Sequence, residues 1–303
     1  MNIKLPFGLQ NEQLVDISSV DGGLACNCIC PCCRKQLIAK KGRIKEHHFA
    51  HYNSEECKGA IETALHIYAK DILENQKRII LPPVYLPNSN KLLFPSIEVY
   101  FDKVLLEKRI DNIIPDLVVF IKGKPLIIEV IVTHRVNRVK AIKIAELGYS
   151  AIAVYVRGLF NYTYYKAFGL QNFEKLLIEE TKFKIWINNQ KQNQIREQIK
   201  TIAVKKKIIN LDGFYGDYPI VDNCPINKKI YKSGYKKGQS YASACHDCWN
   251  CQFGNVISDK IYSYDGKKLF DCEIHEVYCS GHQQEEIDNI IDNFKKRMLL
   301  IEK

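Results

Sequence analysis

The sequence predicts an α/β protein in which a mixed sheet is flanked by helices and by two small cysteine-rich modules. All twelve cysteines fall into two islands, residues 26–57 and 224–279, and the segment between them alternates helical and strand patterns. The 303 residues are 46% hydrophobic and 26% charged, which is typical of a globular chain that buries a core. No apolar run approaches the roughly 18 residues that a membrane span needs.

Charge and cysteine content indicate the compartment and the partner. Charged residues are scattered through the N-terminal "MNIKLPFGLQNEQLVDISSV", so we expect no signal peptide, no membrane association and a cytoplasmic location. Closely spaced thiols in a reducing compartment are more often metal ligands than disulfides. The net charge of +10 favours a polyanionic partner, of which nucleic acid is the usual one.

The first half of the central segment predicts a helix followed by strands. Apolar residues recur at helical spacing over residues 60–76. Residues 96–101 ("SIEVYF") alternate as a strand does. Residues 116–121 and 126–133 are two β-rich runs joined by the turn "KGKP", which predicts a hairpin whose second strand is apolar enough to be central.

The second half returns to helical spacing. Residues 137–147 predict a helix that ends at Gly148, and residues 150–156 ("SAIAVYV") predict another buried strand. We expect residues 171–206 to be largely helical and residues 210–245, rich in Gly, Pro, Tyr and Lys, to be loop-like.

The chain ends in the amphipathic pattern "EEIDNIIDNFKKRMLL", which predicts a terminal helix. Four parts are therefore expected: an N-terminal zinc-binding module (1–59), the core (60–160), a helical linker (161–223), and a C-terminal cysteine-rich zinc module with the terminal helix (224–303).

The N-terminal island has the spacing of a zinc site. Cys30 and Cys33 form a C-x2-C pair, which lets two thiolates bind one tetrahedral ion from a tight turn. His48 and His51 in "HFAH" and then Cys57 offer further ligands. The preferred set is Cys30, Cys33, His51 and Cys57, with His48 as the substitute for one of the last two. "CNCICPCC" allows alternative registers, and free buried thiols with surface imidazoles are the competing interpretation.

The central segment carries carboxylates at hairpin spacing. Asp116 begins one strand of the predicted hairpin and Glu129 lies in the next, so the two can converge, and Glu62 on the preceding helix could add a third. Oxygen ligands of this kind suit Mg²⁺ or Mn²⁺. Such a cation can polarise a phosphate and activate water.

Glu129 is the more informative of these carboxylates. It lies within the apolar run "LIIEVIV", where an ionised carboxylate without a partner is costly. The competing interpretation is a structural ion pair, for which the nearby cations are Arg135, Arg138 and Lys140.

The order of these parts resembles the PD-(D/E)XK nuclease superfamily: a helix with Glu62, then Pro115 and Asp116, then Glu129, a helix and a strand. More narrowly, "CPCC", "HFAH", "ETALHIYAK" and the "PD…EV" hairpin resemble the competence protein CoiA-like nucleases over residues 30–156. The resemblance implies a restriction-endonuclease-like core, a Mg²⁺- or Mn²⁺-dependent deoxyribonuclease, and metal-ligand roles for Glu62, Asp116 and Glu129. It is compatible with DNA uptake, repair or defence against foreign DNA.

One position departs from the superfamily pattern. Where that pattern has Glu-x-Lys, this chain reads Glu129-Val130-Ile131, and isoleucine can neither carry charge nor donate a hydrogen bond. We predict that Lys140, on the following helix, is a migrated lysine and that His134 is a polar partner, although His134 could equally be a satisfied structural histidine. If neither reaches the site, the alternative is a catalytically inactive zinc protein that binds nucleic acid.

The C-terminal island predicts a second metal site. "CHDCWNC" is a tandem C-x2-C-x2-C, which is rare by chance. Zinc is the preferred metal. The alternative is an iron–sulfur cluster, which would indicate a regulatory protein. The neighbouring "KKIYKSGYKKGQSY" combines basic and aromatic residues that suit nucleic acid, or it is a solvated loop. The candidate ligands are Cys224, Cys245, Cys248, Cys251, Cys272 and Cys279.

Overall fold

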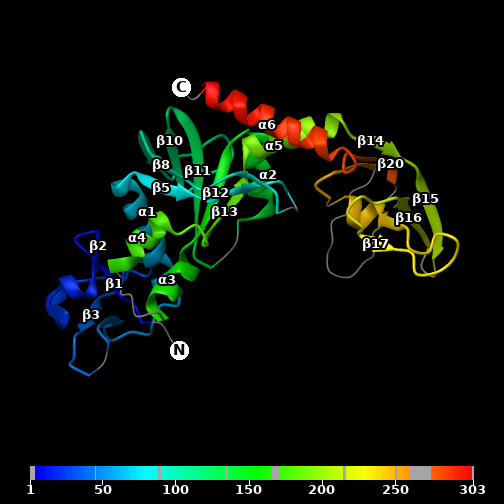
Figure 1. Cartoon of the computed structure of the whole chain (residues 1–303). Helices are drawn as coiled ribbons and strands as arrows, with labels where there is room; N and C mark the ends of the chain where they lie inside the picture. The colour runs from blue at the N-terminus through cyan, green and yellow to red at the C-terminus, as the bar shows by residue number, and fades with distance from the viewer. Residues whose placement is uncertain are drawn as a thin grey trace. The chain divides into compact units, whose positions relative to one another are not determined.

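The computed structural model describes residues 4–301 apart from 45, 88–89, 134–135, 166–170, 214–215, 250 and 259–273 (Figure 1). Internal contacts divide the chain into two compact units. Unit 1 comprises Met1–Pro83 and Pro95–Asn189, and unit 2 comprises Val84–Phe94 and Gln190–Lys303. Unit 1 thus contains the predicted N-terminal module together with the predicted core apart from Val84–Phe94, and the predicted linker (161–223) is divided between the two units. In the described residues, no helix has both the length and the apolar character needed to cross a membrane.

Unit 1 begins with two antiparallel hairpins. The first has a two-residue turn at Asn11 and Glu12, both of which have positive φ. The second carries the "HFAH" segment on its return strand. Their strands are β1 (Phe7–Gln10), β2 (Gln13–Asp16), β3 (Leu37–Lys40) and β4 (His48–His51).

Helix α1 (Ala60–Gln76) has the bounds that the sequence predicted. Leu65 and Leu73 on its apolar face are fully buried. The helix ends where Lys77 adopts the left-handed conformation, with φ 49°, and donates its backbone N–H to the Leu73 carbonyl. Periodicity and burial therefore agree in this segment.

A five-stranded mixed sheet forms the centre of unit 1, in the order β13-β12-β11-β10-β9. Only β11 and β12 are parallel neighbours, as expected for strands connected by a helix. The predicted hairpin is confirmed as β10 and β11, joined at Lys122 and Gly123, whose φ angles of 48° and 73° fit a tight two-residue turn. The strands are β9 (Lys103–Leu106), β10 (Leu117–Ile121), β11 (Lys124–Ile131), β12 (Ser150–Tyr155) and β13 (Lys184–Asn188).

Helices cover both faces of this sheet (Figure 1). Ile128 and its same-face neighbours pack in one core with α1, α3 (Val156–Tyr165) and α4 (Gln171–Glu179). Ile127 faces the other way and packs with Ile144 of α2. Because successive strand residues alternate between faces, the continuous apolar run of β11 is explained by burial on both sides.

Helix α2 (Arg138–Glu146) agrees with the predicted helix. The Asn137 side chain caps its start by accepting a hydrogen bond from the Val139 backbone N–H at 2.8 Å. The chain leaves the helix through Gly148, which has φ 73°. The connection β11–α2–β12 is therefore a parallel crossover.

The prediction of a largely helical segment over residues 171–206 is wrong in part. Helices α4 and α5 (Gln190–Thr201) are present, but β13 between them pairs antiparallel with β12 at the sheet edge. The apolar run of Ile185, Trp186 and Ile187 is too short to stand out between two helical patterns. A separate two-stranded sheet of unit 1 is formed by β5 (Arg78–Leu81) and β8 (Ile97–Tyr100).

The prediction of a loop-like segment over residues 210–245 is wrong in part, because about half of it lies in the strands of a four-stranded sheet in unit 2, in the order β15-β16-β18-β17. The turn-forming residues lie between strands, as Asn223, Asn227 and Gly234 show by their positive φ. A three-stranded sheet, β14-β20-β19, completes unit 2 with the hairpin β6–β7 and the helices α5 and α6, and α6 (Gln284–Ile301) confirms the predicted terminal helix. The remaining bounds are β6 (Val84–Tyr85), β7 (Leu92–Phe94), β14 (Val204–Lys206), β15 (Ile208–Gly213), β16 (Gly216–Asp222), β17 (Lys229–Ile230), β18 (Ser240–Ser243), a π-helix (Ala244–Cys248), β19 (Gly254–Ser258) and β20 (Ile274–Cys279).

Candidate functional site

Three of the predicted N-terminal ligands meet in unit 1. The Sγ atoms of Cys30, Cys33 and Cys57 all lie within 4.8 Å of one another and could hold a metal ion. His51 Nε2 lies 3.3 Å from Cys33 Sγ. The structure therefore brings together the four side chains of the preferred set, three sulfurs and one imidazole, which is a donor set typical of structural zinc.

The local backbone explains how the first two cysteines are presented. The Cys30 N–H donates to the Lys35 carbonyl at 2.8 Å, and the Arg34 N–H donates back to the Cys30 carbonyl at 3.0 Å. This closes a tight turn in which Arg34 has φ 63°. Burial raises the pKa of Cys30, but the backbone N–H groups of Cys33 and Cys32 hydrogen-bond to its sulfur and oppose that effect. Such N–H groups favour the thiolate that a metal requires.

The two histidines of "HFAH" have different roles. They occupy positions of opposite parity on β4, so their side chains point to opposite faces of the hairpin. His51 faces the cysteines, whereas His48 Nδ1 lies 2.8 Å from the Glu46 carbonyl oxygen. The structure does not bring His48, the alternative ligand, to the cluster.

The remaining N-terminal cysteines are not part of this cluster. Cys26 and Cys28 are fully buried in the core of unit 1. Their thiols lie 3.6 Å from the Leu37 carbonyl and 3.1 Å from the Cys26 carbonyl, respectively. Cys32 is exposed. The registers of "CNCICPCC" that use Cys26 or Cys28 are therefore not realised, and these two thiols act as small core residues.

The predicted carboxylates Asp116 and Glu129 lie on adjacent strands. Leu117 is paired with Ile128, and the next step of this antiparallel register brings residue 116 opposite residue 129. Asp116 Oδ2 accepts a hydrogen bond from the Val130 backbone N–H at 2.8 Å, and Oδ1 lies 3.1 Å from His66 Nε2. Burial alone would raise the pKa of Asp116, but the bonds from His66 and Val130 outweigh it and leave that pKa below its usual value.

Glu129 is only 4% exposed, which is unusual for a carboxylate. Lys140 Nζ on α2 lies 2.7 Å from Glu129 Oε2 and also donates to the Ile114 carbonyl at 3.0 Å. Burial raises the pKa of Glu129 to about 7, even though Lys140 lowers it, and the Asp116 charge adds to the rise. Oε1 of Glu129 is buried and accepts no hydrogen bond from any described residue.

Helix α1 presents three polar residues toward this region at i, i+4 and i+8. His66 contacts Asp116 as described. Glu62 Oε1 accepts a hydrogen bond from the Thr133 hydroxyl, two residues beyond β11. Lys70 is buried and its Nζ lies 2.5 Å from Glu107 Oε1. Sequence analysis placed no role on His66, and its helical spacing from Glu62 was the signal that could have found it.

Glu62, Asp116 and Glu129 do not form a group of three at metal-ligand spacing. Among the described residues, only the Cys30, Cys33 and Cys57 cluster has three potential ligand atoms within 4.8 Å of one another. Ile131, in the position of the superfamily lysine, is buried. His134, the predicted polar partner, lies outside the described residues, as do Arg135 and Cys272.

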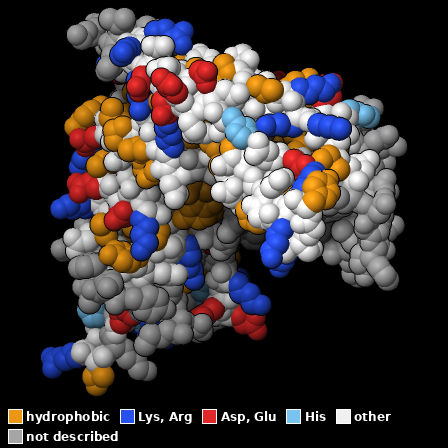
Figure 2. All heavy atoms as spheres, turned by 45° about the vertical axis from the view of Figure 1, so that its right-hand side comes forward, with side chains coloured by type: hydrophobic (Ala, Val, Ile, Leu, Met, Phe, Trp, Pro, Cys, Tyr) orange, Lys and Arg blue, Asp and Glu red, His pale blue; other side chains and the backbone are white. Residues whose placement is uncertain are grey.

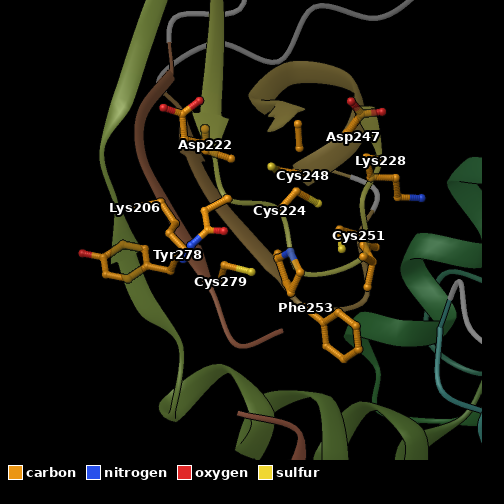
Figure 3. A pocket seen from close by; sticks show the side chains of 16 residues that line it. Lys206, Asp222, Cys224, Lys228, Asp247, Cys248, Cys251, Phe253, Tyr278 and Cys279 are labelled. Atoms are coloured by element: carbon orange, nitrogen blue, oxygen red, sulfur yellow. The ribbon is translucent and has the colours of Figure 1, made fainter. Parts of the chain in front are cut away.

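Four of the C-terminal candidate ligands line one pocket of unit 2: Cys224, Cys248, Cys251 and Cys279 (Figure 3). Cys245 does not line it, although the tandem C-x2-C-x2-C motif predicted that it would share a turn with Cys248 and Cys251. Cys245 lies in the π-helix, three residues before Cys248.

In the basic and aromatic segment "KKIYKSGYKKGQSY", some side chains already have partners within the protein. Lys236 forms an ion pair with Asp222 and lies 5.7 Å from the ring centroids of both Tyr231 and Tyr235. Tyr235 is 91% exposed. On the face of the molecule drawn in Figure 2, Lys and Arg side chains are spread among acidic and hydrophobic ones instead of forming one continuous band.

Comparison with known proteins concerns the N-terminal cluster. Residues 23–60 match the family model of the competence protein CoiA N-terminal domain. No curated protein matches the chain, and no solved structure does. The matched segment contains the four residues Cys30, Cys33, His51 and Cys57 and ends where α1 begins. Over this segment, the chain is therefore similar to the N-terminal domain of CoiA.

Proposed function

We propose that this protein is a nuclease of the PD-(D/E)XK type that hydrolyses phosphodiester bonds of DNA with Mg²⁺ or Mn²⁺. The proposal includes a structural zinc ion at the N-terminal cluster. Its support comes from the order of elements, from the environment of Glu129, and from the match to CoiA over residues 23–60.

The order of the elements supports the proposal at the level of topology. Around the central sheet the chain runs α1, β9, β10, β11, α2, β12, with an antiparallel meander followed by a parallel crossover. This is the order that the superfamily resemblance implies. Fold alone does not establish an activity, which depends on the side chains of the site.

Glu129 is the observation that carries the proposal. An ionised carboxylate in a buried strand is costly unless all of its oxygens are satisfied. Lys140 satisfies one oxygen of Glu129, and the other has no partner among the described residues. A divalent cation prefers carboxylate oxygen, so the unsatisfied Oε1 and the opposite Asp116 fit such a ligand. The fit gives a reason for keeping a charge at this position.

The chemistry divides between the cation and the chain. A bound Mg²⁺ or Mn²⁺ would polarise the scissile phosphate and lower the pKa of an attacking water. His66 and the Val130 N–H hold Asp116 ionised and fix its orientation. Lys140 places a positive charge beside Glu129, where it can orient water and offset the negative charge that develops on the phosphate.

In this proposal, Lys140 takes the role of the lysine that the superfamily pattern has where this chain has Ile131. Ile131 cannot donate, but the Lys140 ammonium reaches Glu129 from the next helix, as expected for a migrated lysine. The same contact also fits the competing interpretation, a structural ion pair. The two interpretations differ in their consequence, because a structural pair requires no cation and predicts no cleavage.

The zinc site has a structural role in this proposal. Cys57 lies three residues before α1, and the other ligands come from the Cys30–Cys33 turn and from β4. A zinc ion there would tie the N-terminal hairpins to the helix that carries Glu62 and His66. All four donors are protein side chains, which is typical of a closed structural site.

A catalytically inactive nucleic-acid-binding protein is the second candidate. Two observations favour it: Ile131 replaces the superfamily lysine, and the three carboxylates are not grouped at ligand spacing. The net charge of +10 fits either candidate.

Cleavage assays separate the two candidates. Purified, zinc-loaded protein is incubated with single- and double-stranded DNA and RNA in the presence of Mg²⁺, of Mn²⁺, or of neither. We expect DNA cleavage that requires the added cation and is abolished in Asp116→Ala and Glu129→Ala, but kept in Glu146→Ala on the exposed side of α2. Binding of DNA without cleavage under every condition would favour the second candidate.

A further inference from the structure

The pocket of unit 2 contains four cysteines that the proposed nuclease activity does not use. We infer that Cys224, Cys248, Cys251 and Cys279 form a second zinc site, and that this metal holds together the two sheets of unit 2. The inference is independent of the proposed function, because all of its residues lie in unit 2.

The four cysteines come from different parts of unit 2 and surround one space (Figure 3). Cys224 follows β16, which belongs to the four-stranded sheet. Cys279 ends β20, which belongs to the three-stranded sheet. Cys248 ends the π-helix, and Cys251 follows it. A single ion bound here would therefore cross-link both sheets and the turn between them.

The backbone around the cysteines has the tight turns of metal-binding knuckles. The Cys251 N–H donates to the Cys248 carbonyl at 3.1 Å, and the Gly254 N–H donates to the Cys251 carbonyl at 3.2 Å. A Cβ atom on Gly254 would lie 2.2 Å from the Cys248 carbonyl oxygen, so only glycine fits. This packing holds the C-x2-C pair in a fixed, compact turn.

The Cys279 end has a matching feature. The Gly281 N–H donates to Cys279 Sγ at 3.4 Å, which is an interaction that favours a thiolate. A Cβ atom on Gly281 would lie 2.5 Å from Pro225 Cγ, so the turn after Cys279 packs closely on the residue after Cys224. The two sequence-distant ligands are therefore held next to each other.

Charge and burial also suit a tetrathiolate site. Cys224 and Cys248 are each 8% exposed, and four thiolates with one Zn²⁺ leave two negative charges in this region. Lys206 and Lys228 line the same pocket and offset that charge. The sulfurs do not form a group within 4.8 Å, but a cysteine sulfur moves inward by rotation about a single side-chain torsion.

The small apolar cluster beside the pocket gives the metal a structural role. Among the described residues this cluster has six buried members, two of which are the ligands Cys224 and Cys248. Structures with few buried apolar side chains depend on disulfides or metals for stability. We therefore expect the part of unit 2 around the pocket to lose its structure when the ion is removed.

Metal content tests the assignment, and Cys245 supplies the matched control because it lies in the same π-helix but does not line the pocket. Full-length protein is prepared with zinc and its metal is measured by mass spectrometry. We expect the wild type and Cys245→Ser to hold about two zinc ions per chain. Cys224→Ser, Cys248→Ser and Cys279→Ser should each hold one ion fewer, and Cys279→His should restore it.

The two tryptophans report on the units separately. Trp186 lies in β13 of unit 1, and Trp249 lies between Cys248 and Cys251 in unit 2. In Trp186→Phe protein, chelation should change the emission of Trp249, and readdition of zinc should reverse the change. Cys30→Ser should lose the other ion and leave the zinc-dependent Trp249 signal in place.

Three results would overturn the inference. The first is wild-type zinc content in the Cys224, Cys248 and Cys279 variants. The second is visible absorption by an iron–sulfur cluster, which would assign another metal. The third is loss of both ions in these variants while Cys245→Ser keeps them, because that would contradict a site confined to unit 2.

Discussion

Replacing Glu129 by glutamine should stabilise the protein in the absence of Mg²⁺ and Mn²⁺, although it removes a proposed functional group. The pKa of Glu129 rises from its ordinary value of 4.5 to about 7, mainly because the side chain is buried. Each unit of pKa difference corresponds to about 1.4 kcal/mol, so keeping this carboxylate ionised in the fold costs about 3 kcal/mol. Glutamine keeps the shape and carries no charge.

The sign of the pH dependence follows from proton binding. Between pH 4.5 and about 7 the folded protein holds a proton on Glu129 that the unfolded chain has released. The free energy of unfolding of the wild type should therefore fall, relative to that of Glu129→Gln, as the pH rises through this range. The full difference of about 3 kcal/mol should be reached above pH 7.

Equilibrium denaturation with urea measures this difference. The protein is kept zinc-loaded, with no chelator and no Mg²⁺ or Mn²⁺. Trp249→Phe is used as the background so that emission from Trp186, whose Nε1 donates to the Pro82 carbonyl at 3.1 Å, reports unit 1 alone. Glu146→Gln on the exposed side of α2 is the control, and it should leave the pH dependence of the wild type unchanged.

A bound cation should stabilise the wild type selectively. Adding Mn²⁺ at pH 8 should raise the free energy of unfolding of the wild type and leave that of Glu129→Gln unchanged, since a ligand stabilises only the state that binds it. If Glu129→Gln proved less stable than the wild type at pH 8 without Mn²⁺, the carboxylate would be a satisfied structural group and the argument would fail.

The remaining predictions concern the zinc cluster and two buried side chains. Cys57→Ser should remove the N-terminal zinc, whereas Cys32→Ser should retain it, and metal analysis distinguishes the two. Burial lowers the pKa of Lys184 from 10.5 to about 7, so wild-type stability should rise with pH over that range by at most about 5 kcal/mol. Lys184→Met should abolish this rise in pH-dependent denaturation, and an unchanged rise would show that Lys184 is charged in the fold. His66→Ala should raise the pKa of Asp116 and move the acid limb of cleavage to higher pH, which a pH–rate profile would detect; an unmoved limb would contradict the proposed orientation of Asp116.

The sequence predicted the structure best where a local pattern, such as helical periodicity or a turn motif, agreed with the tertiary packing. The bounds of α1, the β10–β11 hairpin and the end of α2 at Gly148 follow from periodicity and turn chemistry alone. C-x2-C spacing with "HFAH" indicated the N-terminal cluster, because its ligands lie close together in the chain. In β11, Glu129 stood out because it interrupts a buried strand.

The features that the sequence did not predict depend on contacts between segments that lie far apart in the chain. β13 is short and joins the sheet edge only through pairing with β12. The contact between His66 and Asp116 requires the packing of α1 against the sheet, which no local pattern encodes. Likewise the sequence left Cys224, Cys272 and Cys279 open as the ligand to complete the tandem motif, and only the packing of β20 against the π-helix brings Cys279 to the pocket.

A count of bound Mn²⁺ tests most directly whether Asp116 and Glu129 hold a divalent cation. Electron paramagnetic resonance measures the free Mn²⁺ that remains at increasing concentrations of zinc-loaded protein, and the bound fraction follows by difference. The account predicts that the wild type binds one Mn²⁺ more per chain than either Asp116→Asn or Glu129→Gln. Equal binding by all three folded proteins would contradict it.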